Sequence, residues 1–565
     1  MLNTLLFLPI YWFFRADAAF WPWPKPFLTD PAIWIPDLFF RRANPDIFRV
    51  NAELLVLVLA WVFVPALRRR WFLALAFGLY LAQLVYAVYE GFVRSYYLLD
   101  PVFYNDFFLF ADGTRYVLRS MHLAPLLYVG VVAAILLLMG LLVWLNRLLF
   151  SLSEPALLSR ASRVALVVLG VLALAPLVAF GEESGLPETA VTSFTAKISQ
   201  NIQLSRLAKA EAERFDHQEL APFYQFTQSD LRYKPDIYLI FVESYGSVLY
   251  KRPDFRQRHG QLLDSLAFRL DLNDWAAASA RSEAPTWGGG SWLSYTSAIT
   301  GLRLDSHAQY LALFSRYHQE PFPHLFNYLR GQGYRSYQLT ANSDELNDIE
   351  WQRYKNFYGV DEWLRFEDLQ YQGPLYGWGP SPPDQYAINF AHTYMNKADD
   401  RPHVFFYITQ NSHYPWSPLP EVAADWQTLN DLPALPPSSS ERLPQDVLRQ
   451  QYLASIEYEF NTLVDFIIKQ ADEGDVFVLV GDHQPARVAR YSDGWDTPIH
   501  IISKDPAFIE SFYEYGFVPG LKTQDHTPVM RHEGFYSLFM RVLLQQYGLD
   551  PAHLPEYRPE GVPLN

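Results

Sequence analysis

Four long apolar stretches, with Glu53 as their one Asp, Glu, Lys or Arg, lie before residue 182 of this 565-residue chain, and they limit its fold more than any other feature of the sequence. They cover residues 52–67, 71–89, 121–145 and 164–180. Each approaches or exceeds the roughly 17–25 residues that a helix needs to cross a bilayer. A shorter stretch at 2–14 is either a truncated first span or an interfacial helix. Because four such runs in close succession are too many for a soluble core, the sequence predicts an N-terminal α-helical transmembrane bundle of about five spans over residues 1–181.

The arginines between these stretches predict the orientation of the bundle. Arg68–Arg70 follow the second candidate span, and three more arginines lie within 146–163. The last span is followed by the acidic pair Glu182 and Glu183. Since short cytoplasmic loops are enriched in Lys and Arg, we expect the N-terminus to lie in the cytoplasm and everything past residue 181 to lie outside it.

A polar connector is expected over residues 182–232. Within it, residues 195–214 can form a helix with a weak apolar stripe. Such a helix could lie on the membrane, pack on the following domain or remain a solvated linker, and the residues alone do not decide between these arrangements.

Beyond the connector, residues 233–565 change to short apolar runs that alternate with helical patterns. The candidate strands are 236–242, 335–340, 403–408, 475–480 and 498–503. Near-continuous apolar runs are typical of strands that are covered on both faces of a parallel sheet. The helical patterns include 321–330 and 446–471. Strand–helix alternation predicts an α/β domain with a mainly parallel, doubly wound sheet.

Composition excludes several classes of function. The chain has no cysteine, which rules out a disulfide scaffold, an iron–sulfur protein, a zinc-thiolate site and a cysteine nucleophile. Its net charge is −15, without a long basic run, so we expect no nucleic-acid partner.

Polar side chains follow three of the candidate strands. Glu243 follows the first strand, the segment 409–413 with Asn411 and His413 follows another, and Asp482-His483 follows a third. Because ligands bind at the carboxyl ends of the strands in such sheets, we expect these residues to converge. Two carboxylates and an imidazole suit one divalent cation, Mn²⁺, Zn²⁺ or Mg²⁺. Glu243 taken alone would more often be a helix cap or a surface charge.

A candidate nucleophile lies in the segment 282–301. Thr286 and Trp287 precede Gly288–Gly290, and the following residues can form a helix. Glycines allow backbone amides to approach an anion closely, and a helix N-terminus favours phosphate or sulfate. A hydroxyl bound to the cation could attack phosphorus. The alternative is that Thr286 only caps the helix.

With these motifs in place, the chain resembles the alkaline phosphatase/sulfatase superfamily, and within it the membrane-bound lipoteichoic acid synthase and phosphoglycerol transferase branch. The resemblance covers the spans, the connector and a sulfatase-like domain at about 233–545. It rests on the motifs 241–245, Thr286, 411–415 and 481–484. It implies that Glu243, Thr286, Asp482 and His483 hold one ion, most often Mn²⁺. It further implies that Thr286 is the transiently phosphorylated nucleophile and that the substrate is contacted by His413, Asn411 and Trp287.

The resemblance implies a function at the bacterial cytoplasmic membrane. The Thr286 alkoxide would attack the phosphodiester of a phospholipid donor, release diacylglycerol, and pass a phosphoglycerol or phosphoethanolamine head group to an envelope glycan or lipid acceptor. An envelope phosphodiesterase or phosphatase and a non-catalytic membrane regulator are the alternatives. A sulfatase is disfavoured because the residues 282–285 do not match its formylglycine motif. Pro285 stands where lipoteichoic acid synthases carry a basic residue.

Overall fold

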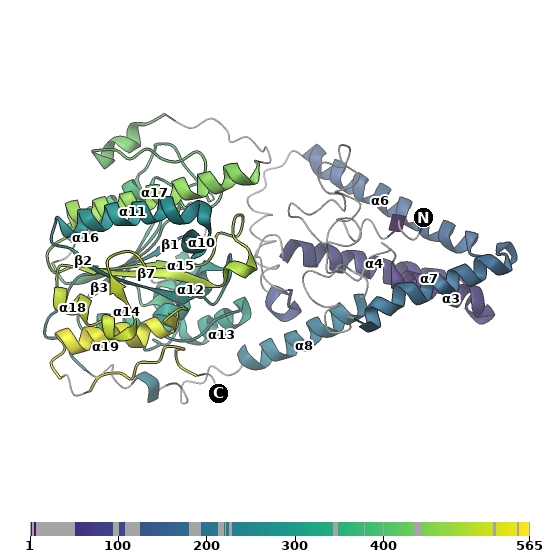
Figure 1. The fold of residues 1–565 in the computed structure, drawn as a ribbon, viewed down its shortest axis with the longest axis horizontal. Helices are drawn as coiled ribbons and strands as arrows, with labels where there is room; N and C mark the ends of the chain where they lie inside the picture. The colour runs from purple at the N-terminus through teal and green to yellow at the C-terminus, as the bar shows by residue number, and fades with distance from the viewer. Residues whose placement is uncertain are drawn as a thin grey trace. The chain divides into compact units, whose positions relative to one another are not determined.

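The computed structural model describes most of the chain, and the residues outside the described part lie mainly in the N-terminal third. The described residues are 2, 5–6, 51–93, 101–107, 125–179, 194–212, 220, 222–224, 229–342, 348–377, 379–398, 400–433, 443–523, 527–550 and 553–563. They divide into two compact units, Met1–Lys209 and Ala210–Asn565 (Figure 1). Each unit is described here by itself.

The N-terminal unit is helical throughout its described part. Its helices are α3 (Ala52–Phe63), α4 (Arg70–Phe92), α6 (Pro125–Leu152), α7 (Arg160–Ala179) and α8 (Phe194–Ala212). Two segments, Arg70–Glu90 and Ala133–Leu152, are long and apolar enough to cross a membrane. Leu136 and Leu137 of α6 are largely exposed within the unit, which fits contact with lipid rather than water. Two apolar helices therefore fit a membrane anchor.

The five predicted spans are not confirmed as a set. The stretches 52–67 and 164–180 form helices α3 and α7, but neither is among the described helices that meet the length and hydropathy of a span. Of residues 2–14, only 2, 5 and 6 belong to the described part, and residues 121–124 lie outside it.

Helix α8 corresponds to the helix predicted at 195–214, and it packs on the N-terminal unit. Lys197 Nζ forms a buried ion pair with Glu90 of α4 at 2.8 Å. The side chain of Asn201 donates to the Pro101 carbonyl at 2.9 Å. Buried polar groups need such partners, so these contacts hold the N-terminal part of α8 within the N-terminal unit.

The C-terminal unit is built around one mixed sheet with the order β4-β3-β5-β1-β6-β7-β2-β8, and β9 pairs with β2. The strands are β1 (Ile237–Val242), β2 (Ala276–Glu283), β3 (Arg335–Thr340), β4 (Glu362–Arg365), β5 (His403–Ile408), β6 (Val476–Gly481), β7 (Asp496–Ser503), β8 (Val518–Pro519) and β9 (Met530–Arg531). The five strands from β4 to β6 are parallel, as predicted.

The sheet was predicted to be mainly parallel, but antiparallel pairings begin beyond β6. Strand β7, predicted as 498–503, runs antiparallel to β6, and β2 runs antiparallel to β7. Neither β2 nor β4 forms an apolar run, so these two strands were not predicted. Two reversals leave β2 running in the same direction as β1 and β6, which brings its carboxyl end to the same edge of the sheet.

Helices cover both faces of the sheet (Figure 1). One face carries α11 (Pro253–Asp271), α16 (Asp384–Ala398) and α17 (Gln445–Gln470). The other carries α12 (Ser291–Thr300), α13 (His307–Tyr317), α14 (Leu325–Gly331), α18 (Pro506–Glu510) and α19 (Gly534–Tyr547). The short α10 (Val248–Lys251) and α15 (Asp348–Tyr358) complete the described helices of this unit.

Strand β1 shows how the two layers are filled. Its six side chains are all buried and alternate between the faces. Leu239 and Phe241 enter the core beneath α12 and α19, whereas Tyr238 and Ile240 enter the core beneath α16 and α17. This two-sided burial explains why the central strands read as continuous apolar runs, and it leaves the polar residues for the strand ends.

Candidate functional site

Three predicted ligand residues meet at the carboxyl edge of the sheet. Glu243 directly follows β1, and Asp482 and His483 directly follow β6, its parallel neighbour. One ligand atom from each of the three lies within 4.8 Å of the others, and all three side chains are buried. His483 Nε2 is 3.4 Å from Asp482 Oδ2 and 3.6 Å from Glu243 Oε1. The predicted convergence is therefore present in the structure.

The carboxylate of Asp482 is held by one oxygen only. Its Oδ1 accepts the backbone N–H of Ser244 at 2.8 Å and that of His483 at 2.7 Å. Its Oδ2 is buried and has no hydrogen-bond partner among the described residues. An unpaired buried carboxylate oxygen is costly, and a cation between these side chains would remove that cost.

The pKa shifts of Asp482 and His483 also fit a cation between these side chains. Burial raises the pKa of the Asp482 carboxyl, and the neighbouring Glu243 raises it further. Burial lowers the pKa of His483, but Asp482 and Glu243 outweigh that effect and raise it. Two carboxylates crowded in a buried site are mutually destabilising without a positive partner, so the donor set fits a divalent cation of the oxygen- and nitrogen-binding type.

The imidazole of His483 is oriented for this role. Its Nδ1 lies 2.9 Å from the Gln484 carbonyl. A carbonyl can only accept a hydrogen bond, so Nδ1 carries a proton and Nε2 is the ring nitrogen that faces the carboxylates; in the neutral ring, its lone pair would be available to a cation. Such a backbone partner fixes both the tautomer and the ring of a metal-ligating histidine.

The backbone around the ligands is tightly constrained. Ser244 has a positive φ of 58°, which turns the chain sharply after β1, and its hydroxyl donates to Glu243 Oε1 at 2.8 Å. The Tyr452 hydroxyl of α17 binds the Ser244 carbonyl at 2.8 Å. At Gly481 a Cβ would stand 2.0 Å from the Tyr245 carbonyl oxygen. Strained positions of this kind are common at functional sites.

Ser291, which was not predicted from the sequence, lies directly among the three predicted ligand residues. It is the first residue of α12. Its Oγ is 3.2 Å from Glu243 Oε2 and 3.2 Å from His483 Nε2. The sequence signal that would have found it is its place immediately after Gly288–Gly290, where the helix begins.

Thr286 lies in the same loop but its hydroxyl is engaged elsewhere. The side chain is fully buried, and Oγ1 donates to the Gly289 carbonyl. Trp287, also buried, accepts the backbone N–H of Gln484 on its carbonyl at 2.9 Å. The loop of Thr286 is thus joined to the loop of Asp482 and His483, while no hydrogen bond is present between Thr286 and the three ligands.

The remaining predicted residues differ in their surroundings. His413 lies close enough to Asp482 and His483 to interact with their charges, and burial is the main reason why its pKa is lowered. Asn411 accepts the Asp384 backbone N–H on Oδ1 at 2.7 Å and donates to the Pro382 carbonyl at 3.3 Å. Its amide therefore supports the loop that carries His413.

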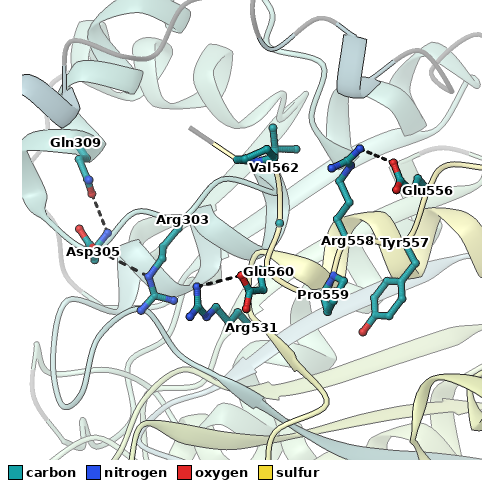
Figure 2. Close-up of a pocket in the computed structure, with 12 residues that line it drawn as sticks. Arg303, Asp305, Gln309, Arg531, Glu556, Tyr557, Arg558, Pro559, Glu560 and Val562 are labelled. Atoms are coloured by element: carbon teal, nitrogen blue, oxygen red, sulfur yellow. Dashed lines mark hydrogen bonds and ion pairs between the residues drawn. The ribbon is translucent and has the colours of Figure 1, made fainter. Parts of the chain in front are cut away.

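A pocket of about 580 Å³ lies beside the end of β2 (Figure 2). Arg303 and Arg531, on its wall, are 3.7 and 3.5 Å from Glu283, the last residue of β2. Figure 2 shows Arg531 beside Glu560 and Arg558 beside Glu556. Because carboxylates pair with each of these guanidinium groups, the pocket offers no excess positive charge for a phosphate.

No family model matches the sequence, and no curated protein does. Solved structures similar to this chain include members of the alkaline phosphatase superfamily, as the motifs predicted. A superfamily protein from Vibrio parahaemolyticus is 14% identical, with 59% of this chain and 77% of that one covered and a TM-score of 0.38. A lipoteichoic acid synthase from Listeria monocytogenes is 14% identical, with 50% and 71% covered and a TM-score of 0.35.

A phosphoglycerol transferase from Streptococcus pyogenes, solved with sn-glycerol-1-phosphate, is 12% identical. The match covers 60% of this chain and 81% of that one, with a TM-score of 0.35. At these identities and TM-scores the similarity assigns no reaction to this chain, so its chemistry has to come from its own side chains.

Proposed function

We propose that this protein is a divalent-cation-dependent transferase of the membrane surface. It would move the phosphate-bearing head group of a phospholipid, of phosphoglycerol or phosphoethanolamine type, to a hydroxyl of an envelope glycan or lipid. One observation carries the proposal: two carboxylates, an imidazole and a serine hydroxyl, from three separate segments, converge in one buried cluster.

Glu243, Asp482 and His483 would hold the cation, with Mn²⁺ favoured and Zn²⁺ or Mg²⁺ as alternatives. When bound, the ion supplies positive charge to the phosphoryl oxygens and lowers the pKa of a nearby hydroxyl. The chain's own part is to fix the geometry. Ser244 and the backbone N–H of His483 orient the carboxylates, and the Gln484 carbonyl orients the imidazole.

His413 is proposed to contact the substrate phosphate or the departing oxygen. Its Nδ1 donates to the neighbouring Tyr414 carbonyl, which fixes the orientation of the ring in its loop. The lowered pKa of His413 keeps the ring neutral near pH 7, so Nε2 can accept a proton. Asn411 and Trp287 are proposed to shape the surrounding loops.

The apolar helices of the N-terminal unit support a lipid substrate. A phospholipid head group stays at the membrane surface, so an enzyme acting on it gains from an anchor that keeps it there. We propose that the C-terminal unit faces the outside of the bacterial cytoplasmic membrane, as the distribution of arginines indicates.

The test uses the full chain in lipid nanodiscs with Mn²⁺ and either labelled phosphatidylglycerol or labelled phosphatidylethanolamine. We expect release of diacylglycerol from one of the two lipids and a head group that becomes covalently attached to residues 282–303, the peptide between Arg281 and Arg303. The Asp482→Asn variant is the matched control. Head-group phosphate released only to water would identify a hydrolase, and failure of both lipids to react would contradict the proposal.

A further inference from the structure

The hydroxyl that lies among the cation ligands belongs to Ser291, not to Thr286. Ser291 Oγ is within 3.2 Å of one oxygen of Glu243 and of the ring nitrogen of His483 that faces the cluster. It also interacts with the Asp482 side chain. A single hydroxyl thus lies within hydrogen-bond distance of two of the predicted ligands and close to the third.

Thr286 does not share these contacts. Its hydroxyl donates its one proton to the Gly289 carbonyl within the same loop. It is fully buried, whereas Ser291 is partly exposed. A nucleophile has to reach a phosphorus atom that arrives from outside, and only the Ser291 hydroxyl combines access with contact to the ligands.

The backbone supports the same assignment. Gly290 precedes α12 with a positive φ of 73°, a conformation that most other residues avoid. It turns the chain so that Ser291 begins the ten-residue helix α12 at the ligand cluster. Anions are favoured at a helix N-terminus. Beside Ser291 lies the buried Asp482 Oδ2, which makes no hydrogen bond to the described residues and is 3.4 Å from His483 Nε2.

We propose that Ser291 is the residue that carries the head group during transfer. This assignment rests on the proposed function. Ser291 Oγ forms a bond to phosphorus while the bond between phosphorus and the departing oxygen breaks. The electron pair of that bond goes to the departing oxygen, the serine proton is released to water, and the departing alkoxide takes a proton from water. An acceptor hydroxyl then attacks the same phosphorus, and the serine hydroxyl is restored.

The experiment locates the adduct rather than measuring activity alone. The full chain with Mn²⁺ is mixed with a phospholipid or with the generic phosphodiester bis(p-nitrophenyl) phosphate, quenched in acid and digested. Tandem mass spectrometry of the peptide 282–303 then assigns the modified residue. We expect the adduct on Ser291 in the wild type and in Thr286→Val, which keeps the shape of the threonine.

In Ser291→Ala we expect no adduct on this peptide and a loss of turnover of at least about a thousand-fold. Ser315→Ala, which changes an exposed serine of α13, controls for the substitution itself. The thermal unfolding midpoint of Ser291→Ala should stay near that of the wild type, which separates lost chemistry from lost folding.

The outcomes distinguish this assignment from the function on which it rests. An adduct on Thr286, or an adduct that persists in Ser291→Ala, overturns the assignment and leaves the transferase intact. An adduct on Ser291 from the generic phosphodiester, with no reaction of either lipid, supports the assignment and contradicts the lipid donor. Turnover without an adduct on any residue overturns the covalent role of Ser291.

Discussion

At the scale of single residues, the two oxygens of the Asp482 carboxylate have different tasks. Oδ1 accepts two backbone N–H groups, whereas Oδ2 makes no hydrogen bond to the described residues and faces His483 Nε2 at 3.4 Å. In Asp482→Asn the amide oxygen can still accept both N–H bonds, so the loop should keep its shape. The charge that a cation needs is lost, however.

We therefore expect Asp482→Asn to fold but to lose most of its bound divalent cation. Metal analysis of the purified full chain, together with titration of Mn²⁺ into the metal-free protein, measures the effect. Circular dichroism checks that the secondary structure is retained. Wild-type affinity for Mn²⁺ in this variant would contradict the assignment of Asp482 as a ligand.

Gly481 is a second residue whose environment permits a sharp prediction. A Cβ there would stand 2.0 Å from the Tyr245 carbonyl oxygen and 3.0 Å from Thr497 Cβ. Gly481→Ala should destabilise the protein by about 1–3 kcal/mol through overpacking and displace the adjacent Asp482. Gly331→Ala is the matched control, because nothing lies within 4 Å of a Cβ at that position in α14.

Thermal unfolding of both alanine variants in the same detergent measures the difference. The Gly481 variant should unfold at a lower temperature than the wild type, and the Gly331 variant at the same or a slightly higher one. Equal midpoints for the two variants would show that the β6 end can absorb the added methyl group.

At the scale of elements, β2 shows what the sequence could and could not reveal. Its residues, AAASARSE, are small or polar and form no apolar run, yet six of the eight are buried. They are tolerated because β7 supplies partners: Ser279 Oγ lies 2.7 Å from His500 Nδ1, and Arg281 pairs with Asp496 at 3.0 Å. Those partners lie more than two hundred residues away in the chain, where no local pattern points to them.

The candidate site, too, was predicted from the sequence only in part. Glu243, Asp482 and His483 were found because each follows an apolar strand of a parallel pair, and strand ends of that kind share an edge. The place of Ser291 beside them was not predicted, because the motif put the candidate hydroxyl at Thr286, five residues before it. Which hydroxyl faces the ligands depends on the turn at Gly290, and the sequence does not specify the path of that turn.

Two buried carboxyl groups at the opposite edge of the sheet make the stability of the fold depend on pH. Asp236 precedes β1 and Asp475 precedes β6. Burial raises the pKa of Asp236 to about 6 and that of Asp475 to about 8. Between the ordinary carboxyl pKa and these values, the folded chain binds protons that the unfolded chain has released, so stability falls as pH rises through this window.

The Asp475→Asn substitution should remove the larger part of this loss of stability at higher pH. The asparagine amide oxygen can still accept the Asp472 N–H, and the side chain cannot become charged. We expect the variant to gain stability over the wild type as the pH is raised from 5 to 9, and thermal unfolding at these two pH values measures that gain. Asp271→Asn, at the exposed end of α11, should show no such trend. A constant difference between wild type and Asp475→Asn would argue against a protonated Asp475.

At the scale of the whole molecule, the N-terminal unit contains a charge pair with almost no exposure to solvent. Lys197 of α8 and Glu90 of α4 are each 1% exposed. Removing one partner leaves the other buried and unpaired, which costs about 3–5 kcal/mol. The Lys197→Ala variant should therefore lower the unfolding temperature of the full chain in detergent.

The double variant Lys197→Met/Glu90→Leu tests the reason for that loss. Replacing both charges with apolar side chains removes the uncompensated charge, so much of the lost stability should return. If the double variant were as unstable as Lys197→Ala, packing around α8 rather than charge pairing would be responsible.

The position of β2 in the sheet has a consequence for how the protein is made. Its neighbours are β7, β8 and β9, all of which follow it by more than two hundred residues. While the chain is still being synthesised, the segment that carries Thr286 and Ser291 has no strand against which to dock. Pairings between such distant segments form slowly. We therefore expect the Ser291 hydroxyl and the residues after β6 to come together only once the strands of the last quarter of the polypeptide have emerged, so an unfinished chain would lack the assembled cluster.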